Sequence, residues 1–115
     1  AFIQREPGYQ RVAAMFETAV ISTVNWSEVA QKCLARNLDW SAVERILIGN
    51  GLRILPFSRV DAELAAALWQ MTRNWGLSLG DRSCLALALR RNCPVVTADR
   101  AWASLSLDVP IELIR

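Results

Sequence analysis

The chain has 115 residues, of which 53% are apolar and 21% are charged, and its net charge is +2. This composition predicts one folded domain, and no apolar run approaches the roughly 20 residues that a membrane span needs. The sequence contains no histidine, which excludes Ser-His-Asp and Cys-His nucleophile systems, histidine-based ribonuclease chemistry and ordinary zinc sites.

The three cysteines, Cys33, Cys84 and Cys93, form no CxxC motif. An odd number without metal-ligand spacing predicts neither a disulfide framework nor a thiolate metal site. Cys84 lies within an apolar run, where a free cysteine acts as a small hydrophobic residue. No basic segment followed by an apolar stretch opens the sequence, so we expect no signal peptide and a reducing, cytoplasmic location.

Short apolar runs alternate with helical patterns along the chain. The sequence predicts helices at residues 8–18, 27–37, 41–49, 59–75, 79–92 and 99–105. It predicts buried strands at residues 19–24, 53–57, 94–97 and 111–114. This alternation is typical of an α/β sandwich around a mainly parallel sheet. Residues 1–3 resemble the approach to a helix, so the opening strand of such a unit is expected to be missing.

Two of these helices are expected to pack in the core. The helix at 59–75 carries an apolar stripe at spacings of three and four residues, formed by Val60, Leu64, Leu68, Met71 and Trp75. We expect this stripe, with Trp69 beside it, to face the core. The helix at 79–92 is apolar on nearly all sides and should be buried.

Three acidic residues fall where α/β sheets place their ligands. Glu28 comes shortly after the run at 19–24, Asp99 follows the run at 94–97, and Asp81 lies at the start of the helix at 79–92. Ligands of open α/β sheets bind beyond the carboxyl ends of the strands. If these strands are parallel neighbours, the three carboxylates converge at one edge of the sheet.

Each of these acids, taken alone, also fits a structural role at a helix N-terminus. Ser78 and Asp81 have the spacing of a capping box, as do Ser58 and Asp61. Asp99 can cap a helix that begins directly after it. The spacing of the whole set, rather than any single acid, favours a shared site.

Several segments together resemble the PIN-domain ribonucleases and, among them, the VapC-like toxins of bacterial toxin–antitoxin pairs. These segments are REPG at residues 5–8, AVISTVNWSEV at 19–29, LSLGDRSCLALAL at 77–89, PVVTADRAWASL at 94–105 and IELIR at 111–115. The resemblance implies a PIN-like three-layer sandwich with a mainly parallel central sheet. It also implies hydrolysis of RNA phosphodiester bonds with Mg²⁺ or Mn²⁺.

The resemblance implies a site whose catalytic and metal-binding residues are Glu28, Asp81 and Asp99. Clustered carboxylates without Cys or His ligands select hard cations, which supports Mg²⁺ or Mn²⁺ on chemical grounds. The remaining candidates are the supporting polar residues Asn25 and Thr97 and the phosphate-contacting arginines Arg82 and Arg100. Exposed arginines beside a helix start are equally often only solvated.

The chain departs from the family pattern at its beginning. The family's opening strand carries an aspartate, and no matching segment precedes Ala1. We therefore expect residues 1–115 to form a single, N-terminally incomplete PIN-like domain, and the natural protein to contain the strand. The alternative is a catalytically inactive PIN-like binding module that lacks the first aspartate. A response-regulator receiver domain fits poorly, because Lys32 lies within a helix and not at the end of a strand.

The expected partners are an RNA substrate, a cognate antitoxin and a second copy of the chain in a homodimer, with no membrane. By resemblance, the helical pair within residues 27–49 binds the antitoxin. Trp26 adjoins the predicted site, where it can either stack on a base or pack in the core.

Overall fold

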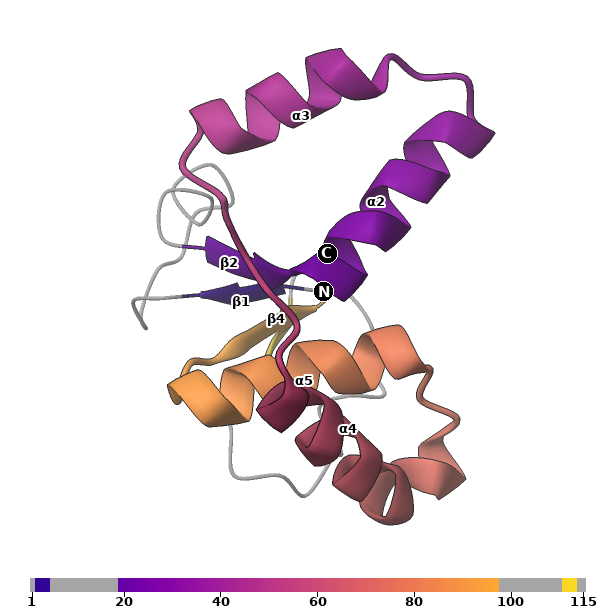
Figure 1. Ribbon diagram of the computed structural model, residues 1–115, viewed down its shortest axis with the longest axis vertical. Coiled ribbons are helices and arrows are strands. Elements are labelled where there is room, and N and C mark those ends of the chain that lie inside the picture. The colour runs from indigo at the N-terminus through magenta and orange to yellow at the C-terminus, as the bar shows by residue number, and fades with distance from the viewer. Residues whose placement is uncertain (1, 5–18, 98–110, 114–115) are drawn as a thin grey trace.

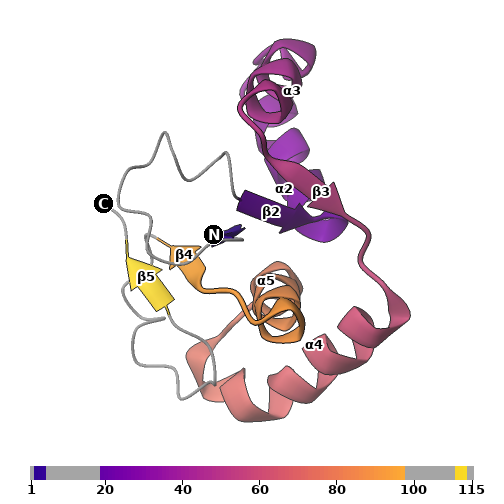
Figure 2. The same cartoon turned by 90° about the vertical axis from the view of Figure 1, so that its left-hand side faces the viewer.

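The computed structural model describes residues 2–4, 19–97 and 111–113, in which helices lie on both sides of a sheet (Figure 1, Figure 2). The predicted helices at 8–18 and 99–105 lie outside these residues. The elements in chain order are β1 (Phe2–Gln4), β2 (Ala19–Ser22), α2 (Thr23–Ala35), α3 (Trp40–Gly49), β3 (Arg53–Leu55), α4 (Arg59–Thr72), the 3₁₀ helix η1 (Arg73–Trp75), α5 (Leu79–Arg91), β4 (Val95–Thr97) and β5 (Ile111–Leu113).

The strands form one sheet in the order β3-β2-β1-β4-β5. β2 is parallel to β3, β4 is parallel to β5, and β1 runs antiparallel to both β2 and β4. Four of the five strands therefore point the same way. This arrangement confirms the predicted α/β fold with a mainly parallel sheet.

β1 lies at the centre of this sheet, where Ile3 pairs with Val20 on one side and with Val95 on the other. The prediction of a helix-like segment at residues 1–3 was wrong for Phe2–Gln4. A gap between β2 and β4 would leave backbone N–H and C=O groups unpaired, at a cost comparable to lost hydrogen bonds. The antiparallel strand supplies those partners.

The two faces of β2 pack into different hydrophobic clusters, because successive side chains of a strand point to opposite sides. Val20 joins the cluster that contains Leu85 of α5. Ala19 and Ile21 join Leu52 in the cluster below α2 and α3. The sheet is thus covered on both faces, which is the predicted three-layer arrangement (Figure 2).

α2 begins at Thr23, four residues before its predicted start. Ser22 is its N-cap, and the Ser22 hydroxyl accepts a hydrogen bond of 3.2 Å from the backbone N–H of Asn25. β2 therefore passes directly into α2, which places the first turns of α2 at the carboxyl edge of the sheet. No helix in the described ranges is long and apolar enough to cross a membrane.

The predicted apolar stripe of α4 was wrong in part. Leu68 is buried, but Val60 is 60% exposed, Met71 is 63% exposed and Trp75 is 43% exposed. Trp69 is also exposed, with the Arg73 guanidinium 5.8 Å from the centre of its ring. α4 is thus rotated from the orientation that its hydrophobic pattern predicts.

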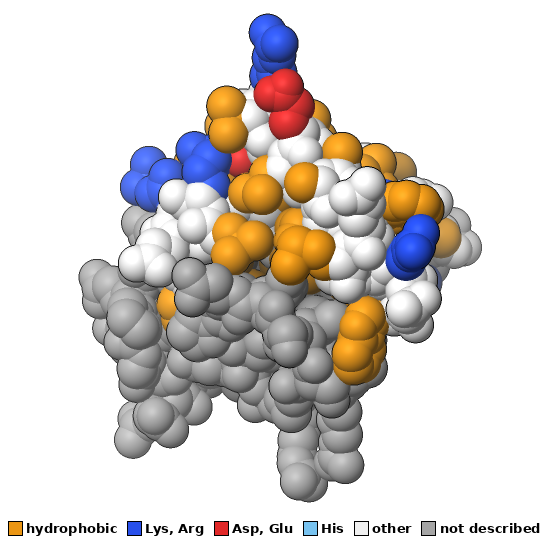
Figure 3. Space-filling model, turned by 90° about the horizontal axis from the view of Figure 1, so that it is seen from below, with side chains coloured by type: hydrophobic (Ala, Val, Ile, Leu, Met, Phe, Trp, Pro, Cys, Tyr) orange, Lys and Arg blue, Asp and Glu red, His pale blue; other side chains and the backbone are white. Residues whose placement is uncertain are grey.

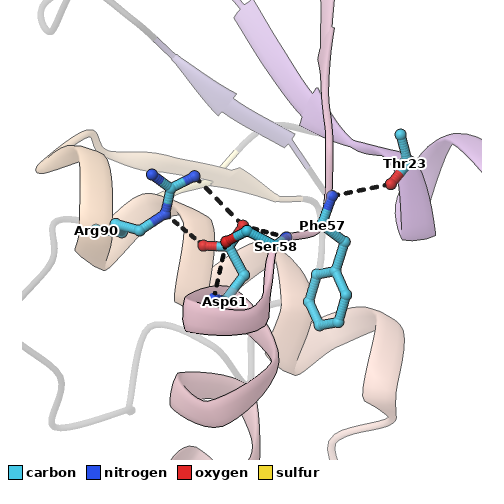
Figure 4. Close-up of polar contacts among 5 residues, drawn as sticks. All are labelled: Thr23, Phe57, Ser58, Asp61 and Arg90. Atoms are coloured by element: carbon cyan, nitrogen blue, oxygen red, sulfur yellow. Dashed lines mark hydrogen bonds and ion pairs between the residues drawn. The ribbon is translucent and has the colours of Figure 1, made fainter.

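A buried carboxylate fixes this rotation (Figure 4). Asp61 accepts a hydrogen bond from the backbone N–H of Ser58 in the predicted capping box, which is confirmed. Its carboxylate also forms an ion pair with Arg90 of α5. Because Asp61 is 1% exposed, the face of α4 that carries it must turn toward α5. Polar contacts, and not hydrophobicity alone, therefore set the orientation of this helix.

Candidate functional site

Glu28 of α2 and Asp81 of α5 line the same pocket, which has a volume of about 290 Å³. Glu28 lies in the second turn of α2, just beyond the end of β2, and Asp81 lies in the first turn of α5. The two acids are 53 positions apart in the sequence, and the fold brings them together as the resemblance implied.

Asn25 links the two helices that carry these acids. Its side-chain amide donates one hydrogen bond of 3.0 Å to Glu28 Oε1 and another of 2.8 Å to the backbone carbonyl of Gly80. Its carbonyl oxygen accepts a hydrogen bond of 2.7 Å from the Ser22 hydroxyl. Asn25 is 7% exposed, so a buried and well-bonded amide orients the Glu28 carboxylate.

Gly80 allows the Glu28 carboxylate to lie against the first turn of α5. A Cβ atom at this position would lie 2.3 Å from Glu28 Oε2 and 2.4 Å from Oε1. Both distances are far below van der Waals contact. The Glu28 carboxylate therefore occupies the space that a side chain at position 80 would fill.

Asp81 both caps α5 and lines the pocket. Its Oδ2 accepts a hydrogen bond of 3.0 Å from the backbone N–H of Ser78, and its own N–H donates to the Ser78 hydroxyl at 3.1 Å. The predicted capping box is confirmed. The same carboxylate lines the pocket, and its Oδ1 accepts no hydrogen bond from any described residue.

Cys84 lies at the base of this pocket and is 3% exposed. Burial, with a smaller contribution from the negative charges of Asp81 and Glu28, raises the pKa of the Cys84 thiol to about 12. The thiol therefore stays protonated at neutral pH, as expected for a structural cysteine.

Of three further predicted site residues, the structure describes one, Thr97. Thr97 ends β4, and β4 points in the same direction as β2, so the fold brings this residue to the edge of the sheet that leads into α2. Asp99 and Arg100 lie outside the described residues.

Arg82 does not line the pocket, although the sequence made it a candidate phosphate contact. Its Nη1 donates a hydrogen bond of 2.8 Å to the backbone carbonyl of Ala65 in α4. Its Nε is buried without a hydrogen-bond partner. The guanidinium thus lies against α4, where it supports the packing of α4 on α5.

The cation that does line the pocket is Lys32, which was not among the predicted site residues. Lys32 follows Asn25 by seven residues and Glu28 by four, so all three lie on one face of α2. This helical spacing is the signal that could have identified it.

Trp26 takes the packing role that the sequence left open. Its ring lies 4.9 Å from that of Trp40, centre to centre, in an edge-on arrangement. It also packs against the cluster of Ala19, Ile21 and Leu52. Trp26 is partly buried and joins α2 to α3 through these contacts.

The donor atoms of the pocket fit a hard divalent cation. Two carboxylate oxygens, Glu28 Oε2 and Asp81 Oδ1, accept no hydrogen bond from any residue that the structure describes. Magnesium is often bound by one or two carboxylates, with water and substrate phosphate completing its shell. Among the residues that the structure describes, no three His, Cys, Asp or Glu side chains form such a group. The described part of the site thus provides two candidate ligands.

Comparisons with known proteins agree with this architecture. A solved toxin–antitoxin complex from Klebsiella pneumoniae contains a chain similar in fold, with a TM-score of 0.58 and 24% sequence identity. The similarity covers 76% of this chain and 68% of that one. No curated protein matches the sequence. Residues 1–106 match the model of the PIN domain family, whose members are generally nucleases. The chain therefore belongs to the PIN domain family.

Proposed function

We propose that this protein is a metal-dependent endoribonuclease that hydrolyses RNA phosphodiester bonds. The observation that carries the proposal is the convergence of Glu28 and Asp81 in one pocket. Asn25 holds the Glu28 carboxylate by a hydrogen bond, and Gly80 leaves space for it. A capping function alone would explain Asp81 but not the fixed position of Glu28.

Glu28 and Asp81 would hold Mg²⁺ or Mn²⁺, with Asp99 as a third ligand. A cation bound there would activate a water molecule and stabilise the charge that develops on the phosphate. Asn25 keeps Glu28 oriented so that its free oxygen remains available. Thr97 would add a polar contact, as the family resemblance implies, and Arg100, next to Asp99 in the sequence, is a candidate phosphate contact.

We further propose that the protein is the toxin of a toxin–antitoxin pair, with α2 and α3 as the antitoxin-binding elements. α3 has no buried residue and lies away from α4 and α5, whereas α2 meets α5 near its first turns, where Asn25 bonds to Gly80 (Figure 1). Leu34 and Leu38 are 64% and 51% exposed, and Ile46 and Ile48 are 61% and 48% exposed. Exposed apolar side chains at this density are typical of a protein-binding surface. The fold similarity to a chain of the Klebsiella pneumoniae complex supports the same assignment.

A homodimer is the second assembly that we propose. Val60 and Met71 of α4, Trp75 of η1 and Leu79 of α5 are all exposed. Apolar side chains gather on the face of the molecule where α4 lies (Figure 3). A stable dimer would bury on the order of 1,200 Å² or more in total. Analytical ultracentrifugation at tens of micromolar protein should show a dimer, and a monomer at that concentration would contradict this proposal.

The test of the nuclease is cleavage of labelled RNA in Mn²⁺, in Mg²⁺ and in EDTA. Glu28→Gln and Asp81→Asn each remove a ligand charge with little change in shape, and Glu63→Gln is the matched control. Glu63 lies on α4 in an exposed ion pair with Arg59, outside the pocket. We expect cleavage only with metal, loss of cleavage in the two site variants and full activity in the control. Equal cleavage by Glu28→Gln and the unsubstituted protein would contradict the proposal.

One observation favours a second candidate, a PIN-fold binding module without hydrolysis. β1 occupies the centre of the sheet, and its residues, Phe2–Gln4, include no carboxylate. The same assay separates the two candidates. A binding module would bind RNA or an antitoxin but leave the RNA intact at every metal concentration.

A further inference from the structure

Lys32 is the only cationic residue among the described residues that line the pocket, and it is the only lysine of the chain. It lies one helical turn beyond Glu28 on α2, which places its Cα about 6 Å farther along the helix axis. A positive charge at this distance is close enough to act on whatever binds between Glu28 and Asp81.

The Lys32 ammonium has no hydrogen bond or ion pair with any described residue, and its side chain is exposed. This is unexpected, because a glutamate four residues before a lysine is the favourable orientation for a helical ion pair. Arg59 and Glu63, at the same spacing in the reverse order, do pair at 3.6 Å. The difference lies in Glu28, whose carboxylate is held by Asn25 and lies over Gly80.

The site therefore combines two carboxylates with a lysine whose ammonium pairs with neither of them. RNA that approaches this pocket brings a negative phosphate toward negative side chains. A divalent cation offsets part of that repulsion, and the lysine is the remaining source of positive charge among the described lining residues. An ammonium on a flexible stem binds phosphate as a point charge, without selecting a base.

We propose that Lys32 is the phosphate-binding residue of this pocket and contacts the RNA backbone next to the metal site. The inference rests on the proposed ribonuclease function and adds a residue that positions the substrate. The rival explanation is that Lys32 only balances the charge of the carboxylates. Both explanations predict that loss of Lys32 strengthens Mn²⁺ binding, but only a direct phosphate contact predicts that RNA binding without metal weakens more than it does when an equal charge is removed elsewhere on the same helix.

The experiment measures RNA binding in EDTA, where no metal-dependent cleavage occurs. Fluorescence anisotropy with short labelled oligo(U) and oligo(A) reports Kd at several KCl concentrations. The variants are Lys32→Met, which removes the charge but keeps the length, and Lys32→Arg, which keeps the charge. Arg36→Met is the matched control, because Arg36 is an exposed cation at the end of the same helix, outside the pocket.

For Lys32→Met we expect Kd to rise about fivefold for both RNAs, since an exposed charge contact contributes up to about that factor. The slope of log K against log salt should fall by about 0.7, the value for one phosphate contact on a single strand. Lys32→Arg and Arg36→Met should bind like the unsubstituted protein. With Mn²⁺, Lys32→Met should raise KM more than it lowers kcat.

Equal RNA binding and equal salt slopes for Lys32→Met and Arg36→Met would overturn the inference, as would failure of the unsubstituted protein to bind either RNA. These outcomes differ from failure of the proposed function itself. In that case the unsubstituted protein would not cleave RNA with any metal, whatever Lys32→Met does to binding in EDTA.

Discussion

Replacing Gly80 by alanine should inactivate the protein without unfolding it. The new Cβ would lie 2.3 to 2.5 Å from three atoms of the Glu28 carboxyl group. Ordinary contact requires at least 3.4 Å, so the carboxylate must move by about 1 Å, and its hydrogen bond from Asn25 would be strained or lost. Displacement of a reacting group by 1 Å costs about 10²-fold in rate.

The effect of this substitution on stability should be small. Alanine is favoured over glycine inside a helix by about 1 kcal/mol, and the lost hydrogen bond costs about the same. The free energy of unfolding, measured with urea, should therefore change by less than about 1 kcal/mol. Metal-dependent RNA cleavage should fall about 100-fold in the same preparation.

The matched control is Gly49→Ala, at the end of α3. No atom lies within 4 Å of a Cβ at this position, so the same chemical change meets no carboxylate. This variant should keep full activity and a stability equal to or above that of the unsubstituted protein. If Gly80→Ala cleaved RNA at the unsubstituted rate, the position of Glu28 over α5 would not matter, and the account of the site would be wrong.

The other predictions concern the residues that support the site. Asn25→Ala should lower cleavage about tenfold or more and raise the KM for Mn²⁺, measured in a metal titration, because Glu28 loses the donor that orients it. Burial raises the pKa of Asp61, but hydrogen bonds from Ser58 and Arg90 and the Arg90 charge outweigh it and hold this pKa below its ordinary value. Asp61 therefore stabilises the fold fully above about pH 4 and loses this contribution as the pH falls further. Asp61→Asn should cost about 2 kcal/mol in urea unfolding at pH 7, and a cost that stayed the same at pH 2 would contradict this explanation. Cys84 should resist alkylation by iodoacetamide at pH 8 in the folded protein, because its pKa is raised to about 12, and rapid labelling would show that the pocket is more open than described.

Hydrophobic periodicity predicted most of the fold. It located each described helix of α2 to α5, and the alternation of strands and helices predicted the layers. It failed at α4, where Val60 and Met71 are exposed although they belong to the clearest apolar stripe. The buried Asp61 carboxylate, paired with Arg90, lies on the face of α4 that packs inward, and hydrophobic patterns do not detect a buried charge.

The centre of the sheet could not be predicted for a different reason. Phe2–Gln4 resembles the start of a helix by local sequence, yet it pairs with strands on both sides. Its extended structure depends on pairing with the backbone N–H and C=O groups of β2 and β4, and these strands come from distant parts of the chain.

The candidate site, too, was predicted only in part. The family resemblance selected Glu28, Asp81 and Asn25 as site residues, and in the structure all three line one pocket, with Asn25 bonded to Glu28. The spacing of Lys32, four residues after Glu28, could have placed it on the pocket side of α2. The sequence could not show that Arg82 bonds to the carbonyl of Ala65, because that contact depends on how α4 packs against α5.

The most direct test of the account is a calorimetric titration with Mn²⁺ that separates the two roles of Asp81. Asp81→Asn removes the charge that would bind the metal, whereas Ser78→Ala removes the partner in the capping box and leaves the Asp81 carboxylate in place. Ser78→Ala should lower stability by about 1 kcal/mol, the usual effect of losing an N-cap, and should bind Mn²⁺ like the unsubstituted protein. Asp81→Asn should lose Mn²⁺ binding at least tenfold, and Glu28→Gln should match it. If Asp81→Asn and Ser78→Ala lowered stability alike and neither changed Mn²⁺ affinity, Asp81 would be only a helix cap and the proposed metal site would not exist.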